Sequence, residues 1–537
     1  MRKLFFLLIF SLSVIKSYSQ WNTDTSVRNP VTLLMYERDP LICRDGDRGY
    51  YIAWQDDYNM LNIKLQRVDT AGYLLWLTAK TLSVGHNYYL EGIVSDDSGG
   101  VYVIGSYTTA GAIGFVDVQR IDQNGDPFWG SNVNLIGNLN SQYSGNVECI
   151  PDGQGGLIVA WDWNNQSSSI DDVYAQRIDR NGNTLWGTGP FTISTNGGLN
   201  NILSDGQSGV VISFFTVGGM IIQHVDSASN FLWGAGVQLS TVGYMFSDGM
   251  GGSIYTYDSV MQGTTYIYFQ HLDSVGTILT PPNGLLLFSD VFNTYDIMPD
   301  NQGNFFFSAT GGDLAQSYIV SAKINSNGVA LWTDTCSLDS TDRWFVKITS
   351  DGLGGSIAVW EDLRYGNGIN TVNGTYYSQH YDANGTQLWA DWGYAVSSSP
   401  NLGTQGGFWD SECFDICTGT DGSAIAVWED SRTGAVNHNR IYMARVDGNT
   451  ITGISEINTH TPSVYPNPVQ GNLKISFHRN IKRGSIAIFT SMGNLITRLN
   501  IENENEKIID LSNYASGLYN ICSYDGETQY CSKVIVD

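Results

Sequence analysis

The sequence predicts an all-β protein, namely an eight-bladed β-propeller followed by a small Ig-like β-sandwich. Three observations support this fold class: a phrase that occurs eight times, a spacing of roughly fifty residues between its copies, and a content of 60 glycines and 66 aromatic residues. The phrase joins a glycine turn, an apolar run, Gln-Arg-apolar-Asp and Gly-x-x-Leu-Trp, and its clearest copy runs from Asp152 to Trp186. Such a period, with short strands between tight turns, is typical of sheets repeated around an axis.

Each copy predicts four antiparallel strands, which is one blade. In the clearest copy they cover 146–150, 157–161, 173–179 and 185–194, with the last strand beginning at the Leu-Trp pair. Short strands between Gly and Asn turns, without helical periodicity, favour an antiparallel sheet. The acidic or amide residue that closes the third element recurs as Asp69, Asp122, Asp179, Asp226, Asp273, Asn325, Asp382 and Asp447.

The last copy stops before its Leu-Trp strand, and a spare copy of that strand stands near the N-terminus. Gln20-Trp21 followed by Val31-Thr32-Leu33 resembles the missing piece. We therefore expect the N-terminal strand to pair with 441–446 and to close the ring, which removes two sheet edges. The fourth-strand positions are then Trp21, Trp76, Trp129, Trp186, Trp233, Thr280, Trp332 and Trp389.

The chain is predicted to contain four segments. Arg2 and Lys3 precede a short apolar run and a polar exit, which is typical of a secretory signal peptide at 1–19. The propeller is expected at 20–453, a linker at 454–463 and a C-terminal sandwich at 464–537. No later stretch is apolar enough to span a membrane as a helix.

The C-terminal segment carries an ordered set of short motifs. Tyr465-Pro466-Asn467-Pro468 opens it, Met492-Gly493 lies in the middle, and Gly517-Leu518-Tyr519 and Lys533-Val534-Ile535-Val536 close it. This set resembles the type A C-terminal sorting domain of the Bacteroidetes type IX secretion system. The resemblance implies passage through the periplasm, export by that machinery, removal of the domain, and attachment to the cell surface or release.

Charge and cysteine content limit the partners. The chain has 27 basic and 52 acidic residues, a formal charge of −25, which disfavours nucleic acid and anionic membranes as partners. No cofactor is expected, although some of the surplus carboxylates could bind calcium. Cys522 and Cys531 flank a hairpin signal and are predicted to form a disulfide. The pairing of the other five cysteines is left open: Cys43, Cys149, Cys336, Cys413 and Cys417.

Two second strands end in the same charged phrase, a candidate ligand site. The residues are Glu361, Asp362 and Arg364 in one copy and Glu429, Asp430 and Arg432 in the next. A Glu-Asp pair beside an arginine could act as acid and base or bind sugar hydroxyls. Repetition in several blades favours a scaffold role, in which Asp and Arg hold the loop, because a catalytic pair is needed only once.

A long loop of the same region adds an aromatic candidate. Phe408, Trp409 and Asp410 lie on the glycine-rich stretch 397–412, which is expected on the face with the variable loops. An aromatic ring beside an acid suits stacking on a sugar, and capping of the blade interface is an equally good interpretation.

A basic residue recurs on every third strand, and three of these residues are histidines. Strands of neighbouring blades lie too far apart for the three imidazoles to bind one metal ion. We expect each basic residue to pair with the acid two positions on and to stack on a fourth-strand tryptophan. The series is Arg67, Arg120, Arg177, His224, His271, Lys323, His380 and Arg445.

No catalytic signature is present in the sequence. The favoured hypothesis is a secreted, surface-attached module for binding or adhesion, with a glycan or protein as ligand. The alternative is a secreted glycoside hydrolase or polysaccharide lyase with carboxylates at the ring centre, and a third possibility is a passive coat protein. A channel carboxyl with a raised pKa would favour the enzyme, and a shallow aromatic groove would favour binding.

Overall fold

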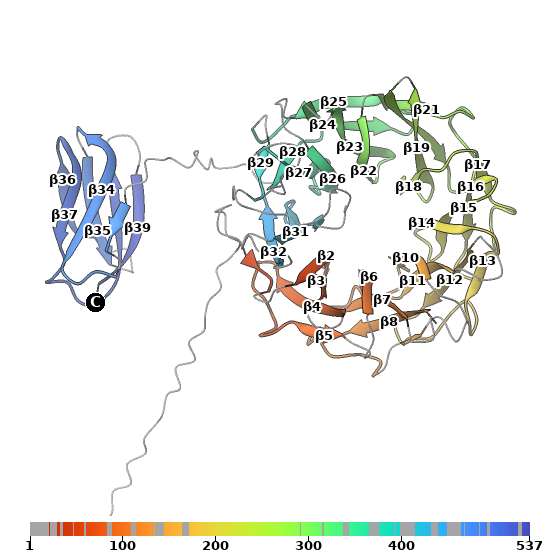
Figure 1. Cartoon of the computed structure of the whole chain (residues 1–537), viewed down its shortest axis with the longest axis horizontal. Coiled ribbons are helices and arrows are strands. Elements are labelled where there is room, and N and C mark those ends of the chain that lie inside the picture. Colours follow the sequence, from red (N-terminus) through yellow and green to blue (C-terminus); the bar gives the residue numbers. More distant parts are fainter. Residues whose placement is uncertain are drawn as a thin grey trace, which may run out of the picture. The chain divides into compact units, whose positions relative to one another are not determined.

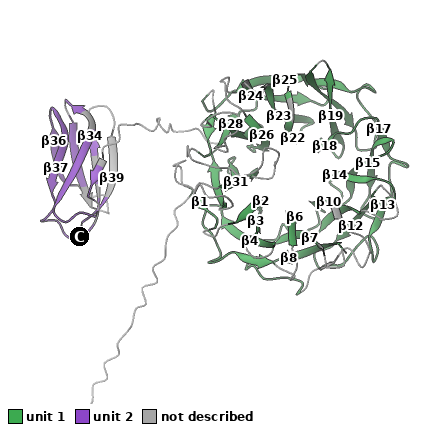
Figure 2. Cartoon of the chain, in the orientation of Figure 1, with its two compact units in different colours: residues 1–450 green, residues 451–537 purple. Residues whose placement is uncertain are grey.

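The computed structural model describes most of the 537 residues. The described residues are 21, 29–32, 36–46, 48–57, 61–82, 88–108, 114–130, 133–134, 144–163, 171–261, 263–289, 291–313, 316–336, 343–364, 375–390, 393–397, 414–430, 439–447, 463–466, 468–482, 484–490, 495–524 and 529–536. The chain divides into two compact units, 1–450 and 451–537, coloured separately in Figure 2. The predicted signal peptide lies outside the described residues.

Within its described residues, unit 1 contains eight four-stranded antiparallel sheets and no helix, which confirms the all-β prediction. The sheets follow one another around a ring, and the first strand of each lies nearest its centre (Figure 1). The first four sheets are β2 (Glu37–Arg44), β3 (Gly49–Asp56), β4 (Asn62–Asp69) and β5 (Lys80–Leu82); β6 (Tyr88–Ser95), β7 (Val101–Thr108), β8 (Gly114–Ile121) and β9 (Val133–Asn134); β10 (Ser144–Pro151), β11 (Leu157–Trp163), β12 (Asp172–Ile178) and β13 (Phe191–Ser194); and β14 (Gly198–Ser204), β15 (Val210–Thr216), β16 (Gly219–Val225) and β17 (Val237–Leu239).

The second half of the ring repeats the pattern. Its sheets are β18 (Tyr244–Ser247), β19 (Ser253–Met261), β20 (Thr264–Leu272) and β21 (Leu285–Ser289); β22 (Val291–Pro299), β23 (Asn304–Asp313), β24 (Gln316–Asn325) and β25 (Ala330–Cys336); β26 (Arg343–Ser350), β27 (Ser356–Asp362), β28 (Thr375–Tyr381) and β29 (Tyr394–Ala395); and β30 (Phe414–Thr418), β31 (Ala424–Asp430), β32 (Arg440–Val446) and β1 (Asn29–Pro30).

The N-terminal strand completes the last sheet. Asn29 lies opposite Met443 and Pro30 opposite Tyr442, and the Val31 N–H donates to the Ile441 carbonyl at 2.9 Å. The N-terminal segment therefore pairs with the predicted partner strand. The residues that pair, Asn29 and Pro30, come eight and nine positions after Trp21, so Trp21 itself is not part of the strand.

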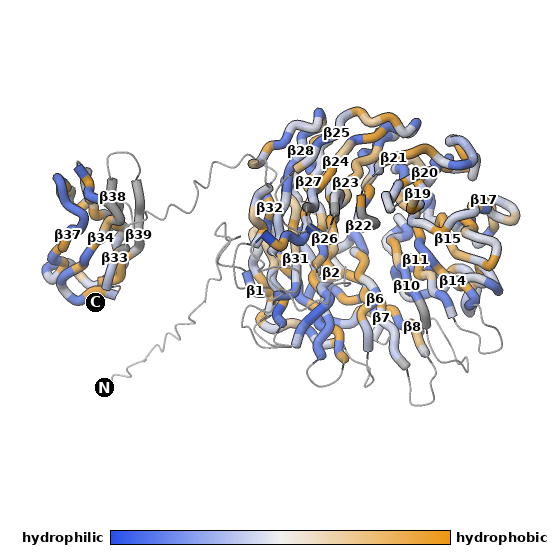
Figure 3. The backbone as a smooth tube through the Cα atoms, turned by 45° about the horizontal axis from the view of Figure 1, so that its top comes forward, coloured by the Kyte–Doolittle hydropathy of each residue, from blue (hydrophilic) through white to orange (hydrophobic). Residues whose placement is uncertain are grey.

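The strands are rich in apolar residues (Figure 3). Successive side chains point to opposite faces, and second strands such as β11 are buried at every position, so each sheet packs one row of side chains against each neighbour. The core accordingly lies between sheets. One cluster joins Ile158 and Ala160 of β11 to Leu199, Val210 and Ile212 of the following sheet. A ring built in this way has rigid strands and two faces of connections.

The two faces differ in their connections. The tight turns between first and second strands and between third and fourth strands form the turn face. The links between second and third strands, and from one sheet to the next, form the loop face, and many of these links are long. Rigid strands that display variable loops are a common platform for ligands.

The fourth strand begins later than the sequence predicts. In the β10–β13 sheet, Leu185 and Trp186 belong to the turn after β12, and pairing resumes only at Phe191. The Leu185 N–H donates to the Arg177 carbonyl at 2.8 Å, which folds the chain back and turns the Trp186 indole inward. The Leu-Trp phrase is thus a turn element in this sheet, whereas in the β22–β25 sheet Leu331 and Trp332 lie on β25, as predicted.

Unit 2 consists of two antiparallel sheets around one core. The three-stranded sheet has the order β33 (Ser463–Tyr465), β34 (Asn472–Ile481) and β37 (Glu504–Asp510), and the four-stranded sheet has the order β36 (Leu495–Ile501), β35 (Gly484–Thr490), β38 (Gly517–Tyr524) and β39 (Gln529–Val536). Leu473, Ile475, Ile488, Ile521 and Val534 are among the buried side chains between them.

Candidate functional site

Every sheet of unit 1 ties its first turn to its third strand through an aspartate and a basic residue, here called the Asp–basic pair. The aspartate opens the first glycine turn, 19 to 29 residues before its partner. In seven of the eight pairs the basic nitrogen lies 2.6 to 3.1 Å from the carboxylate oxygen. The pairs are Asp45–Arg67, Asp96–Arg120, Asp152–Arg177, Asp205–His224, Asp248–His271, Asp300–Lys323, Asp351–His380 and Asp421–Arg445.

The predicted acid partner two residues on is wrong for most of the series. Asp69, for example, accepts the backbone N–H groups of Ala71 and Tyr73 at 2.9 and 2.8 Å and so holds its own turn. Its carboxylate is therefore not available to Arg67. Arg445 differs in that it also contacts the later acid, Asp447, at 2.8 Å.

Two histidines of the series contact the tryptophan of their own sheet, but the rings meet edge-on or tilted rather than in the predicted stack. The rings of His224 and Trp233 lie 5.5 Å apart, and those of His380 and Trp389 lie at the same distance. Arg120 instead lies over Phe128, with its guanidinium carbon 4.0 Å from the ring centre. The series is a repeated packing element in each sheet.

In five of the Asp–basic pairs the pKa of the carboxyl is lowered, namely at Asp96, Asp205, Asp248, Asp300 and Asp351. Burial raises the pKa of Asp96, but hydrogen bonds from Arg120 and from the Gly100 and Ser98 backbone outweigh it, so the pKa is lowered. The same balance lowers the pKa of Asp248, where His271 and the Met250 and Gly252 N–H groups are the donors. A pair that satisfies a buried carboxylate in this way stabilises the turn and leaves no free acid for catalysis.

Asp362, a predicted ligand residue, is a buried anchor. It is fully buried and accepts hydrogen bonds from Arg343 (3.1 Å), Arg364 (2.6 and 2.7 Å) and the Trp360 indole (3.1 Å). Arg343 is itself 1% exposed, and the Arg364 guanidinium lies 3.5 Å from the Tyr377 ring centre. These contacts are those expected of the scaffold interpretation.

The equivalent residues of the next sheet show part of the same arrangement. Asp430 is buried and receives the Trp428 indole N–H at 3.4 Å, and Glu429 contacts Asn439. Glu361 lies beside Asp362 at the end of β27 and is partly exposed. Arg432 lies outside the described residues, as do Phe408, Trp409 and Asp410, so their assignment stays a prediction.

Three charged side chains meet near the ring centre that sequence reasoning did not single out. Asp296 of β22, Lys347 of β26 and Asp415 of β30 occupy the same register position on consecutive innermost strands. Asp415 accepts from Lys347 and from the Ile42 N–H, both at 3.0 Å. Asp296 accepts the Ile348 N–H at 2.9 Å. The two carboxylates thus cap backbone groups on the inner edge of the following sheet.

A second carboxyl pair lies on β6 and β10. Burial, and then repulsion from Glu91, raise the pKa of Glu148 to about 7. Glu91 accepts a hydrogen bond from the Ser106 hydroxyl at 2.5 Å. Burial also raises the pKa of Asp296 to about 6 and that of Glu37, at the start of β2, to about 7. All three carboxyls lie on first strands and meet the pKa criterion for an enzyme, and Glu148 is the one whose pKa is raised by a neighbouring glutamate.

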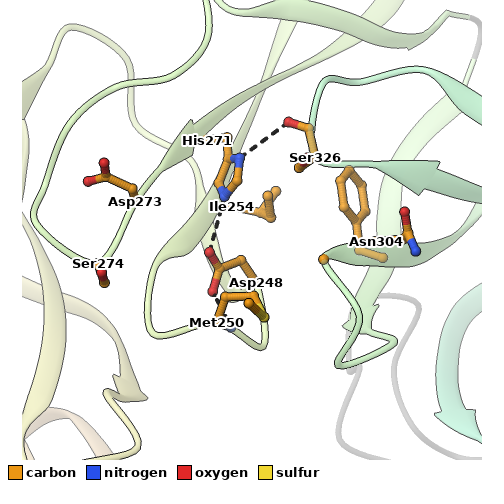
Figure 4. A pocket seen from close by; sticks show the side chains of 10 residues that line it. Asp248, Met250, Ile254, His271, Asp273, Ser274, Asn304 and Ser326 are labelled. Atoms are coloured by element: carbon orange, nitrogen blue, oxygen red, sulfur yellow. Dashed lines mark hydrogen bonds and ion pairs between the residues drawn. The ribbon is translucent and has the colours of Figure 1, made fainter.

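A pocket of about 310 Å³ opens on the turn face between the β18–β21 and β22–β25 sheets. Figure 4 shows His271 at its centre, between Asp248 and Ser326. The lining residues are Asp248, Met250, Ile254, His271, Asp273, Ser274, Gly303, Asn304, Phe305 and Ser326. Apolar walls with a few polar groups are typical of a small-ligand site.

Exposed apolar side chains gather on the loop face of two neighbouring sheets, β14–β17 and β18–β21. Their exposed fractions lie between 41% and 87%. They stand at the loop ends of strands or in the short links themselves, and Tyr244 packs edge-on against Tyr295 at 5.9 Å. The side chains are Phe215, Val217, Val242, Tyr244, Val260 and Met261, called the loop-face patch below.

The described residues contain neither a metal-binding cluster nor a membrane-spanning helix. No group of three or more His, Cys, Asp or Glu side chains among them could hold a metal ion. None of the described segments is a helix able to cross a membrane. Cys43, Cys149, Cys336 and Cys417 are free thiols, and Cys413 lies outside the described residues.

The sorting-motif residues map to the edges of unit 2. Tyr465, Pro466 and Pro468 are exposed near the end of β33, Gly517 and Tyr519 begin β38, and Asn467 lies outside the described residues. Lys533 lies on β39 opposite Asn520. The backbone places Cys522 directly opposite Cys531 on β38 and β39, which is the register that the predicted disulfide requires. The bond itself stays a prediction.

Two sheets around one core, with these motifs in order, define unit 2 as an export signal of a secreted protein. Residues 463–537 match the family described as the secretion system C-terminal sorting domain, so this segment is a type IX secretion sorting domain. The chain is therefore a substrate of that machinery, destined for the cell surface or the medium. No curated protein matches the chain.

Several solved structures are similar to the chain at low sequence identity. An ulvan lyase, a polysaccharide lyase solved with -[GlcA(1-4)Rha3S]-, is 10% identical, with 79% of this chain and 95% of that chain covered and a TM-score of 0.39. Drosophila Semaphorin 2a is 9% identical, with 97% and 99% covered and a TM-score of 0.39. An endo-arabinase from Bacteroides thetaiotaomicron is 14% identical, with 55% and 96% covered and a TM-score of 0.27. TM-scores below 0.5 leave the function of this chain open.

Proposed function

We propose that unit 1 is an eight-bladed β-propeller, closed by β1, that acts as a secreted binding or adhesion module for a glycan or protein ligand. Unit 2 is then an Ig-like sandwich that is removed after export. Eight four-stranded sheets in a ring and the pairing of Asn29 with Met443 support the propeller. The two-sheet core around Ile475 and Ile488 supports the sandwich.

The loop-face patch is the observation that carries the binding function. A surface that exposes several large apolar side chains on adjacent elements is typical of an interaction site. Tyr244 is 52% exposed and is held by Tyr295, so its ring is positioned before any ligand arrives. A fixed aromatic ring suits stacking on a sugar or packing against a protein side chain at low entropic cost.

The candidate residues near β27 and β31 fit this proposal as supports of the loops. Asp362 and Arg364 anchor the start of the 365–374 link, and Asp430 lies at the start of the 431–438 link. Trp409 with its neighbours Phe408 and Asp410 is a second proposed contact on the same face.

We expect Tyr244→Ala to lower the affinity of the exported protein for its ligand by about tenfold or more, because an aromatic anchor contributes on the order of 1–2 kcal/mol. Binding would be measured on a glycan array and against surface proteins, with and without a calcium chelator, which also tests the proposed calcium dependence. Leu185→Ala is the matched control, since Leu185 is 44% exposed but lies on the turn face. Equal affinity of the Tyr244 and Leu185 variants for the ligand would show that the loop-face patch is not the binding site. Trp409→Ala, compared with the same Leu185 control, tests the second proposed contact.

A carbohydrate-active enzyme is the second candidate, and Glu148 favours it. Its pKa of about 7 would allow it to donate or accept a proton near neutral pH, with Glu91 as the neighbouring carboxylate. In this candidate, Glu148→Gln abolishes cleavage of a polysaccharide panel, while Glu91→Gln lowers the pKa of Glu148 and shifts the pH profile toward acid.

Glu148 also predicts a pH-dependent stability that does not require a substrate. Its pKa is raised from 4.5 to about 7, so its contribution to stability is full below pH 4.5 and is lost as the pH rises through 7. Glu148→Gln should therefore raise the free energy of unfolding at pH 8, by on the order of 1–3 kcal/mol, and change it little at pH 4. Urea unfolding at the two pH values measures this. An equal effect at both pH values would show that the pKa of Glu148 does not differ between the folded and the unfolded protein.

A further inference from the structure

One sheet of the ring lacks the tryptophan that the others carry after their third strand. The residue in the β18–β21 sheet is Thr280. The turn that leads to it is otherwise unchanged, because the Leu279 N–H donates to the His271 carbonyl at 2.8 Å, as Leu232 does to His224. The backbone therefore presents Thr280 where its counterparts present an indole.

The indoles of the other sheets pack in equivalent places. Each can contact the second strand of its own sheet, as Trp76 does Tyr51 (6.0 Å), Trp129 does Tyr102 (5.8 Å) and Trp332 does Phe306 (6.3 Å). Trp21 contacts Tyr50 of the following sheet at 6.3 Å. In the β18–β21 sheet, the counterpart of Tyr51 is Ile254, and the counterpart of Tyr50 in the following sheet is Phe305. Both line the pocket of Figure 4.

A turn carbonyl of the following sheet accepts two hydrogen bonds in three of these places. The Gln123 carbonyl accepts from the Trp76 indole and from Arg67, both at 3.2 Å. The Arg180 carbonyl accepts from Trp129 and Arg120, and the Ser227 carbonyl accepts from Trp186 and Arg177, at 3.0 to 3.3 Å. One lone pair thus serves the basic residue and the other serves the indole.

The corresponding carbonyl beside the pocket belongs to Ser326. The described residues supply it with one donor, the His271 Nδ1 at 3.2 Å. Thr280 is turned away to accept the His271 backbone N–H at 3.3 Å. The second lone pair, to which the indole N–H donates at the equivalent carbonyl of four other sheets, is therefore available at the pocket. The indole N–H groups of Trp233, Trp332 and Trp389 have no hydrogen-bond partner among the described residues.

The absent indole is replaced only in part. Trp233 lies over Gly276 and Trp332 over Gly385, each close enough that a Cβ on the glycine would clash with the ring. Phe269 and Leu285 cover the equivalent Gly328. The space beyond them, between Ile254, His271, Phe305 and Ser326, stays open as the 310 Å³ pocket, called the indole slot below.

We propose that the indole slot binds a tryptophan side chain presented by a partner protein. The ring packs between Ile254 and Phe305, and its N–H donates to the Ser326 carbonyl. The seven tryptophans at equivalent positions of the same chain are the reason for choosing this ligand, because they show the ring size that such a site accepts. Four of them also donate their indole N–H to the equivalent turn carbonyl. The slot lies on the turn face, so this inference does not depend on the proposed ligand of the loop face.

N-acetyl-tryptophanamide is the probe for this site, used on the full exported chain. We expect saturable binding to one site, with shifts confined to residues around Ile254 and Ser326 in a methyl and amide NMR titration. The analogue methylated on the indole nitrogen should bind roughly 3–10-fold more weakly, because it lacks the donor for the Ser326 carbonyl. Equal binding of both compounds, or no saturable binding of the first, overturns the proposal.

Variants separate this site from binding elsewhere on the surface. Thr280→Trp should abolish probe binding by filling the slot from within. Ile254→Phe should also abolish probe binding, because the larger side chain fills the slot from its wall. This variant is expected to fold, since Phe306 and Tyr102 occupy the equivalent positions of other sheets. Trp186→Thr should create a second site and raise the stoichiometry to two. Unchanged probe binding in both filled variants, or displacement of the probe by free hexoses, contradicts a tryptophan site, and loop-face binding should survive Thr280→Trp.

Discussion

Replacing Asp362 with alanine should destabilise unit 1 by about 3–5 kcal/mol, the largest effect that we expect from a single substitution. The carboxylate is fully buried and is the acceptor for Arg343, which is 1% exposed, and for Arg364. Removal of the acid leaves a buried guanidinium without its counter-charge, which costs far more than a surface ion pair contributes. Urea unfolding of the purified exported protein measures the loss.

The adjacent Glu361 is the matched control for this prediction. It lies one position earlier on β27 with its side chain partly exposed. Glu361→Gln should change the free energy of unfolding by less than about 1 kcal/mol. A stable, well-folded Asp362→Ala protein that has lost ligand binding would contradict the anchor role and would return Asp362 to the ligand site.

Deletion of residues 20–33 should open the ring. The deletion removes β1 from the edge of β32 and the Trp21 indole, which donates to the Thr70 carbonyl at 2.8 Å and covers Gly72. Two exposed sheet edges favour aggregation. We expect most of the protein to become insoluble and the remainder to melt on the order of 10 °C lower, since each lost kcal/mol lowers Tm by a few degrees in a domain of this size.

Trp21→Ala separates the two contributions, because it removes the indole and keeps the strand pair of Asn29 with Met443. Its loss of stability should be the smaller one, and the protein should stay soluble. A truncated chain that is soluble, with the melting temperature of the intact protein, would show that β1 does not close the ring.

The repeat made the sheets predictable because each copy carries its own local signals. Glycine turns and the apolar runs between them indicate where a hairpin begins and ends, so the second and third strands of the clearest copy, expected at 157–161 and 173–179, were placed within two residues of β11 and β12. The fourth strand was placed too early because Leu-Trp is apolar and reads as a strand. Its backbone is instead committed to the turn, through the bond from Leu185 to Arg177.

Pairing across a hairpin was harder to predict than the hairpin itself. The sequence signal for the Asp–basic pairs was present, since an aspartate opens each first turn, for example Asp45 and Asp96. The nearer acid was preferred because two residues apart on a strand share a face. The choice failed because the nearer carboxylate is consumed by its own turn, as at Asp69. Arg343 lies opposite Asp362 across the β26–β27 hairpin, but no repeated motif marks it. The Asp296–Lys347–Asp415 row could not be found, because its members come from three consecutive sheets that pack side by side only in the folded protein.

The closing strand pair has a consequence for the order of events during synthesis and export. Asn29 meets Met443, so the two partners are separated by more than four hundred residues of chain. A contact of such sequence separation forms late and slowly, since the loop entropy of the whole repeat array must be overcome first. The sheets between them contact only neighbours and can fold one after another as they emerge. The chain therefore spends its early life as an open, curved array that any edge-binding chaperone could recognise, and it becomes a ring only when its last sheet has been made.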